Sequence, residues 1–243
     1  MILAKCLAVV FLAALAVAKM PSFVTVCGRR NPNLGKCVKD SMDELRNRLR
    51  SGIPELNLPP QDPLHIEQFT LSDTESLKAS AHDVTITGLS DFETKSVEID
   101  LKGQQFHSLS LYKKVIIDAE YDVNSKIVIP ITGRGPIHIV SDDVLSEMVM
   151  KYKLVKKNGV DYMRITSVNI SLTLKNWTAA FEPSATVDGT LVAAINKALE
   201  GAREEVFNTL RPNIEKVIAE LTFDRANKVT ETFTFDELFP DRE

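Results

Sequence analysis

The sequence predicts an α+β fold in which a strongly curved antiparallel sheet wraps around one long helix. Residues 64–181 alternate between apolar and polar side chains with a period of two, and residues 188–227 carry apolar side chains at spacings of three and four. A strand of about 15 residues spans roughly 50 Å and a helix of about 40 residues roughly 60 Å, whereas a compact domain of this size is about 45 Å across. Either the domain is elongated or the helix breaks, and the long strands favour an elongated domain.

Residues 1–18 are predicted to be a secretory signal peptide. Lys5 supplies a charged start, the run CLAVVFLAALAVA supplies a short apolar core, and residues 16–18 form an A-V-A cleavage site. The run is too short for an ordinary transmembrane span, and a core helix at this position would need a polar face that the run does not have. We therefore expect a secreted, extracellular protein in which residues 19–243 form a single domain.

The composition of the remaining chain is that of an ordinary globular domain. The formal charge of the full sequence is −4 and no basic stripe is present, so nucleic acid is not an expected partner. No later stretch is apolar enough to cross a bilayer, so no transmembrane insertion is expected. No cofactor motif occurs either, and the expected cofactor set is empty.

Cysteines and glycosylation sequons agree with secretion. Cys27 and Cys37 remain once Cys6 leaves with the signal, and an even pair in an oxidising compartment indicates a disulfide. The nine residues between them do not match a zinc knuckle. Sequons at Asn169 and Asn176 indicate N-glycosylation. Asn169 should face outward, because its apolar neighbours alternate around it.

The first helix is predicted over residues 35–51. Its apolar face consists of Val38, Met42, Leu45 and Leu49. Gly52 and Pro54 should end this helix, and residues 53–66 are rich in proline and should be extended.

The clearest strand covers residues 109–123, and we expect its apolar side chains to share one face in spite of Lys113. These side chains are Leu109, Leu111, Val115, Ile117, Ala119, Tyr121 and Val123. Further along the chain, Asn158-Gly159 predicts a tight hairpin between two more long strands.

Residues 131–140, ITGRGPIHIV, look at first like a phosphate-binding loop. Such a loop needs a helix after it, yet the period of two continues on both sides. His138 stands where the third glycine of GxGxxG would be, and no GK[ST] occurs. Glycines within a strand pattern more often mark a bulge or bend, which is our interpretation, and Pro130 fits an irregular or edge position.

The long helix is expected to start at Asp188, a plausible N-cap, and to run to about residue 227. Pro212 removes one backbone donor and predicts a kink. After the helix, Phe233 and Phe235 alternate and a short turn closes the chain.

These segments, in this order and spacing, resemble the insect takeout and haemolymph juvenile-hormone-binding family. The resemblance covers residues 24–240 and rests on CGRRNPNLGKC, SGIPELNLPPQDPLHI, VIPITGRGPIHI, NTLRPNIEKVI and FDELFP. It implies a helix wrapped by a curved sheet that encloses an apolar tunnel for a lipid-like ligand. Hormone carriers of this family have a second disulfide, but no cysteine follows Cys37, so the chain resembles the takeout branch.

The first functional hypothesis is a secreted carrier of a small hydrophobic ligand. The candidate tunnel residues are Val115, Ile117, Tyr121, Ile129, Ile137, Met148, Met150, Trp177, Ile195, Leu199, Val206 and Leu210. A lipid hydrolase is disfavoured, since neither G-x-S-x-G nor H-E-x-x-H occurs and the four histidines lie in separate strand patterns. An interaction module on the same fold, with its interior filled by side chains, is the alternative that the sequence leaves open. A receptor or other protein partner cannot be named from these residues.

Overall fold

The computed structural model describes residues 20–126, 131–183 and 188–243. Their secondary structure consists of α1 (Leu34–Ser51), a 3₁₀ turn (Pro54–Leu56), β1 (Leu64–Asp73), β2 (Leu77–Thr87), β3 (Phe92–Asp100), β4 (Gln105–Ser125), β5 (Ile131–Lys157), β6 (Val160–Thr173), β7 (Asn176–Phe181), α2 (Gly189–Thr230) and α3 (Phe235–Leu238). The chain therefore has the predicted α+β composition, with one long helix near its C-terminal end.

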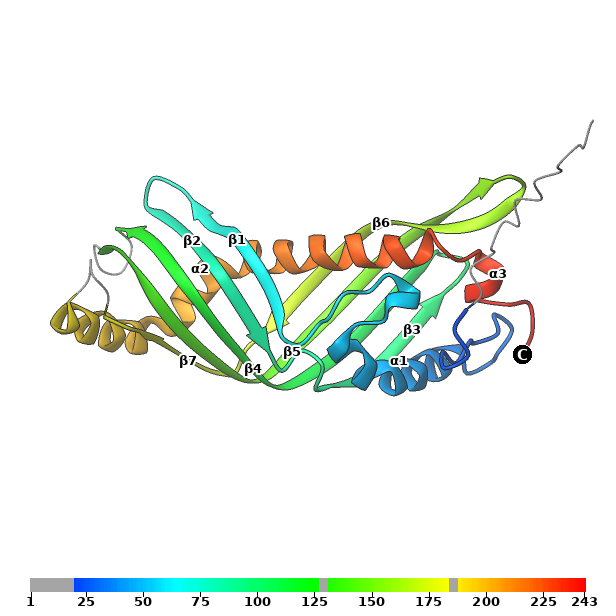
Figure 1. Ribbon diagram of the computed structural model, residues 1–243, viewed down its shortest axis with the longest axis horizontal. Coiled ribbons are helices and arrows are strands. Elements are labelled where there is room, and N and C mark those ends of the chain that lie inside the picture. Colours follow the sequence, from blue (N-terminus) through cyan, green and yellow to red (C-terminus); the bar gives the residue numbers. More distant parts are fainter. Residues whose placement is uncertain (1–19, 127–130, 184–187) are drawn as a thin grey trace, which may run out of the picture.

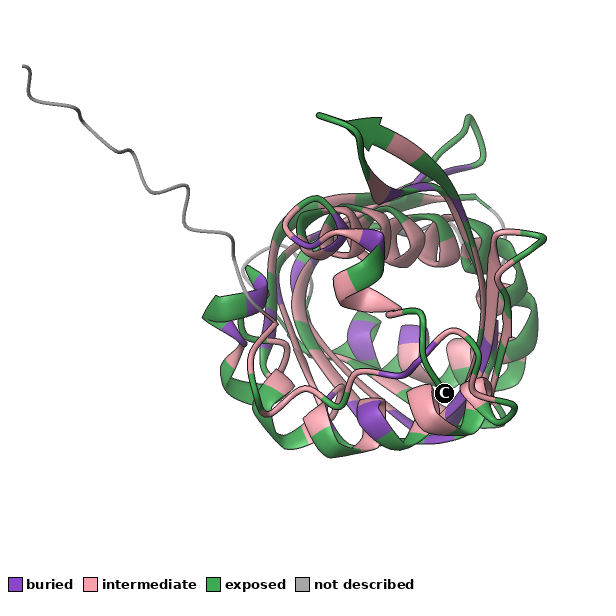
Figure 2. Cartoon of the chain, turned by 90° about the vertical axis from the view of Figure 1, so that its right-hand side faces the viewer, coloured by how far each residue is buried: buried purple, intermediate pink, exposed green. Residues whose placement is uncertain are grey.

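All strand pairs are antiparallel, and the sheet runs in the order β1-β2-β4-β5-β6. β2 and β3 pair with different halves of β4. In the same way, β6 and β7 pair with different parts of β5. β4 and β5 contain 21 and 27 residues, so they run along most of the molecule. The sheet does not close on itself but curls around α2, as Figures 1 and 2 show.

The predicted hairpin joins β5 to β6. Asn158 and Gly159 have φ angles of 52° and 82°. A two-residue turn of type I′ requires positive φ at both central positions, which Asn and Gly tolerate better than other residues. This turn fixes the register of β6 on β5, with Lys157 opposite Val160.

β4 and β5 both change faces in the middle of the sheet, which corrects the prediction of one continuous apolar face. Tyr112 and Val115 both contribute to the cluster that packs on α2, although an odd separation puts two residues of a regular strand on opposite faces. The change coincides with Asp143 of β5, which has a φ of 53° and lies between paired positions of the two strands. The prediction was wrong for Leu109 and Leu111, which lie on the outer face, where Leu109 is paired with the exposed Glu147.

The prediction of a bulge or bend at the two glycines of residues 131–140 was also wrong. Gly133 and Gly135 lie in the regular ladder of β5, opposite Val123 and Tyr121. The glycines therefore leave the inner face of β5 without side chains beside Tyr121. Pro130 lies outside the described residues.

α2 is a single helix of 42 residues. The Asp188 side chain accepts hydrogen bonds from the N–H groups of Thr190 and Leu191, which confirms it as the N-cap. Pro212 lies inside the helix, and α2 changes direction in its first half (Figure 1). A proline disturbs the turn that precedes it, so a change of direction on that side of Pro212 agrees with the predicted kink.

α2 covers the open edges of the sheet with polar side chains. These side chains bond to strand backbone groups that have no neighbouring strand on that side: Asn196 to both groups of Phe181, Arg203 to the Trp177 carbonyl, Asn213 to the Leu71 carbonyl, Glu215 to the Leu172 N–H and Asn227 to the Ile165 N–H. Unpaired edge groups are otherwise costly to bury. The helix therefore completes the wall that the sheet leaves open.

α1 lies along β3 and is fixed there by polar contacts. Arg46 donates to the Phe92 carbonyl at 2.7 Å, and Thr94 donates to Asp43 at 3.0 Å. Cys27, in the N-terminal arm, and Cys37, in the first turn of α1, form the expected disulfide, with their Cα atoms 5.9 Å apart.

Candidate ligand-binding interior

The centre of the molecule is an apolar contact between the inner face of the sheet and α2. Val115, Val144 and Leu172 are buried there. Phe207, Ile214 and Ile218 of α2 pack against them, together with half-buried residues of the sheet. None of these three helix residues was among the candidates, although their spacing of seven and four places them on one helix face.

A second apolar region fills the end of the molecule where the chain terminates. Phe233 is completely buried with Ile53 and Leu56, and Phe235 is buried with Tyr152 and Met163. Figure 2 looks onto this end and shows the C-terminal segment across the ring that the sheet and α2 form. Aromatic side chains therefore close one end of the interior.

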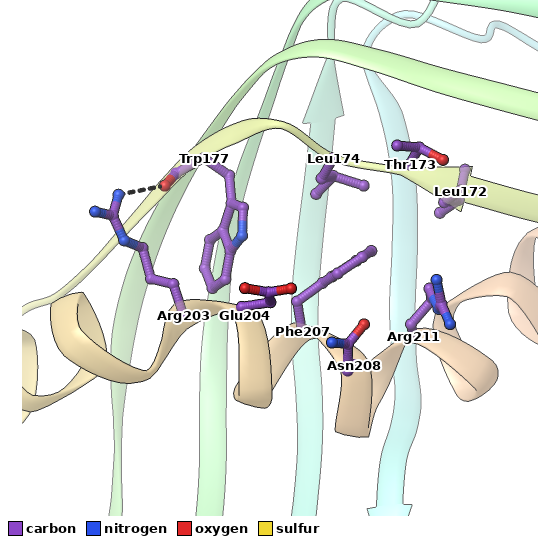
Figure 3. A pocket seen from close by; sticks show the side chains of 9 residues that line it. All are labelled: Leu172, Thr173, Leu174, Trp177, Arg203, Glu204, Phe207, Asn208 and Arg211. Atoms are coloured by element: carbon purple, nitrogen blue, oxygen red, sulfur yellow. Dashed lines mark hydrogen bonds between the residues drawn. The ribbon is translucent and has the colours of Figure 1, made fainter.

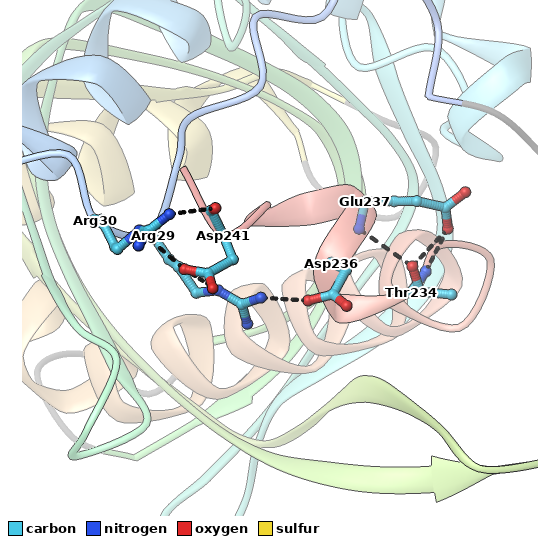
Figure 4. A network of polar contacts seen from close by, with 6 residues as sticks. All are labelled: Arg29, Arg30, Thr234, Asp236, Glu237 and Asp241. Carbon is cyan, nitrogen blue, oxygen red and sulfur yellow. Dashed lines mark hydrogen bonds and ion pairs between the residues drawn. The ribbon is translucent and has the colours of Figure 1, made fainter. Parts of the chain in front are cut away.

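Polar contacts hold this closing segment in place (Figure 4). Arg29 pairs with Asp236 at 2.6 Å, and Arg30 pairs with Asp241 at 3.0 Å. A capping box between Thr234 and Glu237 starts α3, because each residue accepts a hydrogen bond from the backbone N–H of the other. The disulfide-bonded N-terminal arm thus secures the C-terminal segment.

The opposite end has a smaller cluster around the start of α2. Val192 and Ile195 are buried and pack against Phe181 of β7. Phe181 in turn meets the edge of Tyr121, with ring centroids 4.7 Å apart.

The candidate lining residues divide by burial. Val115, Tyr121 and Ile195 are buried, and Ile129 lies outside the described residues. The others are only half-buried: Ile117, Ile137, Met148, Met150, Trp177, Leu199, Val206 and Leu210.

Strand pairing and packing show which candidates come together. Ile117 joins Val115 in the central cluster, and Met150 joins the cluster at the closed end. Ile137 is paired with Phe181 at the other end. The candidates are therefore spread along the whole inner face and do not form one compact site.

A cavity of about 240 Å³ lies beside α2, where β6 passes into β7 (Figure 3). Its lining consists of Leu172, Thr173, Leu174, Trp177, Arg203, Glu204, Phe207, Asn208 and Arg211. Because Leu172 and Phe207 also belong to the central cluster, this cavity borders the interior. Small-molecule sites usually measure about 300–1,000 Å³, so the cavity by itself would hold only part of a ligand.

Three tyrosines of the inner face have a raised pKa. Burial raises the pKa of Tyr112. The pKa of Tyr121 is raised by burial and by the negative charge of Glu120, and that of Tyr152 by burial and by the negative charge of Asp100. The phenols therefore remain uncharged hydrogen-bond groups at physiological pH.

The outer face carries the histidines and the sequons. His107 contacts Glu147 and His138 contacts Asp118, at 2.7 and 2.6 Å. Asn169 is exposed, which confirms its predicted outward orientation.

Ser80 contacts His82 at 3.0 Å, a pairing of hydroxyl and imidazole that could suggest nucleophilic chemistry. Both residues flank Ala81, which is buried opposite Tyr121, so they lie on the outer face of β2 and away from the apolar interior. Among the described residues, no group of three His, Cys, Asp or Glu side chains could hold a metal ion. No helix in the described part of the chain is long and apolar enough to span a membrane.

The fold and the interior together define a class of protein. In this class, a curved, open sheet and one long helix surround an apolar interior that is incompletely buried. The chain belongs to the haemolymph juvenile hormone binding protein family, whose model matches residues 6–240.

Two relatives place the chain within this class. A putative beta-carotene-binding protein of Schistocerca gregaria is 24% identical over 215 residues, which cover 87% of this chain and 86% of the relative. The crystal structure of Epiphyas postvittana Takeout 1 superimposes with a TM-score of 0.77 at 17% identity and covers 89% of this chain and 99% of the other. The latter similarity confirms the fold.

Proposed function

We propose that the protein is a secreted carrier that holds a small hydrophobic ligand, lipid- or terpenoid-like, in an apolar tunnel between α2 and the inner face of the sheet. The observation that carries this proposal is the incomplete burial of inward-facing apolar side chains. Ile117 and Ile139 are paired on the same face as the buried Val115, yet both are only half-buried. Protein interiors are normally packed as densely as organic crystals, so this face has room for a further apolar molecule.

The separation of the buried core supports the same proposal. The buried residues form separate clusters at the centre and at the two ends of the molecule. An ordinary domain has one contiguous core. The half-buried residues between the clusters, such as Leu199 and Leu210, would line the ligand.

The relatives support an apolar ligand. The name of the Schistocerca gregaria relative refers to β-carotene, a long hydrocarbon, and the family is named for a hormone-binding protein.

Secretion is supported by the predicted signal at residues 1–18 and by the disulfide. Secretion from eukaryotic cells should yield a chain that starts at Lys19, with glycans on Asn169 and Asn176 that an N-glycosidase removes.

Ligand binding can be tested with the secreted protein. Native mass spectrometry before and after organic extraction should reveal a bound hydrophobic molecule. Displacement of a fluorescent apolar probe by fatty alcohols of increasing length should show affinity that rises with chain length, because apolar burial contributes about 25 cal/mol per Å² before the costs of association. Salt should change these affinities little. If no member of the series binds and no molecule is extracted, the carrier function is wrong and an interaction module is the better account.

A further inference from the structure

The hydroxyl oxygen of Tyr121 is a buried polar atom for which the described residues supply no hydrogen-bond partner. The side chain is only 6% exposed. Buried polar groups in native proteins are almost always hydrogen-bonded, so an exception needs an explanation. A ligand that supplies the missing partner is one explanation, and the surroundings of Tyr121 indicate what that ligand would be.

Tyr121 lies on the inner face, where the neighbouring strands leave space for its ring. Its partner on β2 is Ala81 and its partner on β5 is Gly135, so neither strand places a large side chain beside it. The ring meets Phe181, which packs against Val192 and Ile195 of α2. The phenol is therefore enclosed between the sheet and the helix.

The immediate surroundings of the hydroxyl on this face are apolar. The nearest inner-face positions along β4 are Ala119 and Val123, and Val123 is paired with Ala79 and Gly133. Glu120 and Asp122 belong to the outer face, where Asp122 pairs with Arg134. Burial and the negative charge of Glu120 raise the pKa of Tyr121, which keeps the phenol protonated and able to donate.

We propose that Tyr121 donates a hydrogen bond to an uncharged oxygen, a carbonyl or hydroxyl, at one end of an otherwise apolar ligand. This inference rests on the proposed carrier function. An ionised carboxylate is a poor fit, because one neutral donor does not compensate for its loss of water and the nearby Glu120 would repel it. The ligand class is thus an oxygenated isoprenoid or fatty chain, with its polar end near the start of α2.

The Phe181 ring is the group that must yield to such a ligand. The Tyr121 hydroxyl is shielded from solvent, and Phe181 lies against its ring. The Asn196 amide holds both the N–H and the carbonyl of Phe181, at 2.9 and 3.0 Å, so a change in the ring's rotamer need not move the strand. Phe181 is only half-buried, which leaves it room to rotate.

The test compares farnesal, farnesol and farnesene, which share one isoprenoid chain, by displacement of N-phenyl-1-naphthylamine from the secreted protein. Tyr121→Phe should weaken the binding of farnesal and farnesol about tenfold relative to farnesene, since only the oxygenated ligands lose a hydrogen bond. Farnesene should bind both proteins equally. Without ligand, Tyr121→Phe should be at least as stable as the parent protein, because no partner is lost.

Tyr152→Phe is the matched control. Tyr152 is also buried, but its hydroxyl faces the Leu101 carbonyl at 3.5 Å in the cluster at the closed end. This variant should leave the ratio of farnesal to farnesene affinity unchanged.

Three results would overturn the inference. If Tyr121→Phe binds all three ligands with the parent's ratios, the hydroxyl makes no contact with the ligand, although the carrier function stands. If farnesoate, the carboxylate with the same isoprenoid chain, is measured beside the three ligands and loses more affinity than farnesal through Tyr121→Phe, the ligand oxygen is charged. If Tyr121→Phe is destabilised without ligand, the hydroxyl has a partner within the fold. Failure of both proteins to bind the probe and every terpenoid would instead remove the carrier function itself.

Discussion

The side-chain amide of Asn196 bonds to both the backbone N–H and the backbone carbonyl of Phe181, as a neighbouring strand would. The Phe181 N–H donates to the Asn196 Oδ1 atom at 2.9 Å, and the Asn196 Nδ2 atom donates to the Phe181 carbonyl at 3.0 Å. Phe181 is the last residue of β7, and its backbone on this side faces α2 and no further strand of the sheet. A helix side chain therefore takes the place of a strand.

Removing this amide should destabilise the protein. Asn196→Ala leaves a half-buried N–H and carbonyl of Phe181 without partners, and we expect a loss of about 1–3 kcal/mol in the free energy of unfolding. Urea unfolding at pH 7 measures the effect. Asn208→Ala, at an exposed position of the same helix, is the control and should change stability by less than about 0.5 kcal/mol. Equal effects of the two substitutions would show that the pairing with Phe181 contributes nothing.

Asp62 should make the stability depend on pH in acid. Burial opposes its ionisation, but hydrogen bonds from the Ser90 hydroxyl at 2.6 Å and from the Ser90 and Gly88 N–H groups at 3.0 Å, with the charge of Arg50, lower its pKa below 3.8. A lowered pKa in the folded state gives stability that is present above about pH 4 and is lost as the pH falls through the folded-state value.

Asp62→Asn should therefore lower the free energy of unfolding by about 1–3 kcal/mol at pH 7, because one side of the amide directs an N–H group at these donors. The loss should become progressively smaller below about pH 4, where the Asp62 carboxylate of the parent protein becomes protonated. Urea unfolding at pH 7, 4 and 3 tests this dependence. Asp73→Asn serves as the control, because Asp73 is exposed and only 3.7 Å from Lys78. A constant difference between Asp62→Asn and the parent protein across this range would contradict the assignment.

Local sequence signals predicted two of the element boundaries well. Asn158-Gly159 predicted the β5–β6 turn because few other residues tolerate positive φ at both positions, and Asp188 predicted the start of α2 because its carboxylate satisfies free N–H groups. Each of these features depends on a few adjacent residues, so a single sequence contains the information.

Features that depend on distant residues were missed. The face change at Asp143 had a signal in retrospect, since Lys113-Lys114 and Asp142-Asp143 each place two charged residues in succession within a strand. The edge contacts of α2 had none, because Asn213 looks like any polar residue on the solvent side of a helix. Its partner, the Leu71 carbonyl, is 142 residues away in the sequence. The lining residue Phe207 was missed for a related reason, because the direction change in α2 shifts which helix face is turned inward.

The disulfide should contribute to stability mainly through the unfolded chain. Cys27 and Cys37 are ten residues apart, and a loop of this length gives about 2–3 kcal/mol in the entropic model. The double substitution Cys27→Ser, Cys37→Ser should lower the free energy of unfolding by that amount, and a reductant should lower the stability of the parent but not of the variant. Thiol titration of the denatured, non-reduced secreted protein should find no free thiol, and two titratable thiols would contradict the pairing.

A substitution to tryptophan can distinguish empty interior from packed core. Val192 is buried with 5% exposure, whereas Leu199, two turns further along α2, is half-buried. Val192→Trp should overpack its cluster and cost about 1–3 kcal/mol. Leu199→Trp should fill free volume, so stability should change little while the capacity for long ligands falls. Thermal unfolding and probe displacement on both variants measure these effects. If Leu199→Trp is as destabilised as Val192→Trp and ligand capacity is unchanged, the space beside Leu199 is packed core, and the tunnel does not extend along this part of the helix.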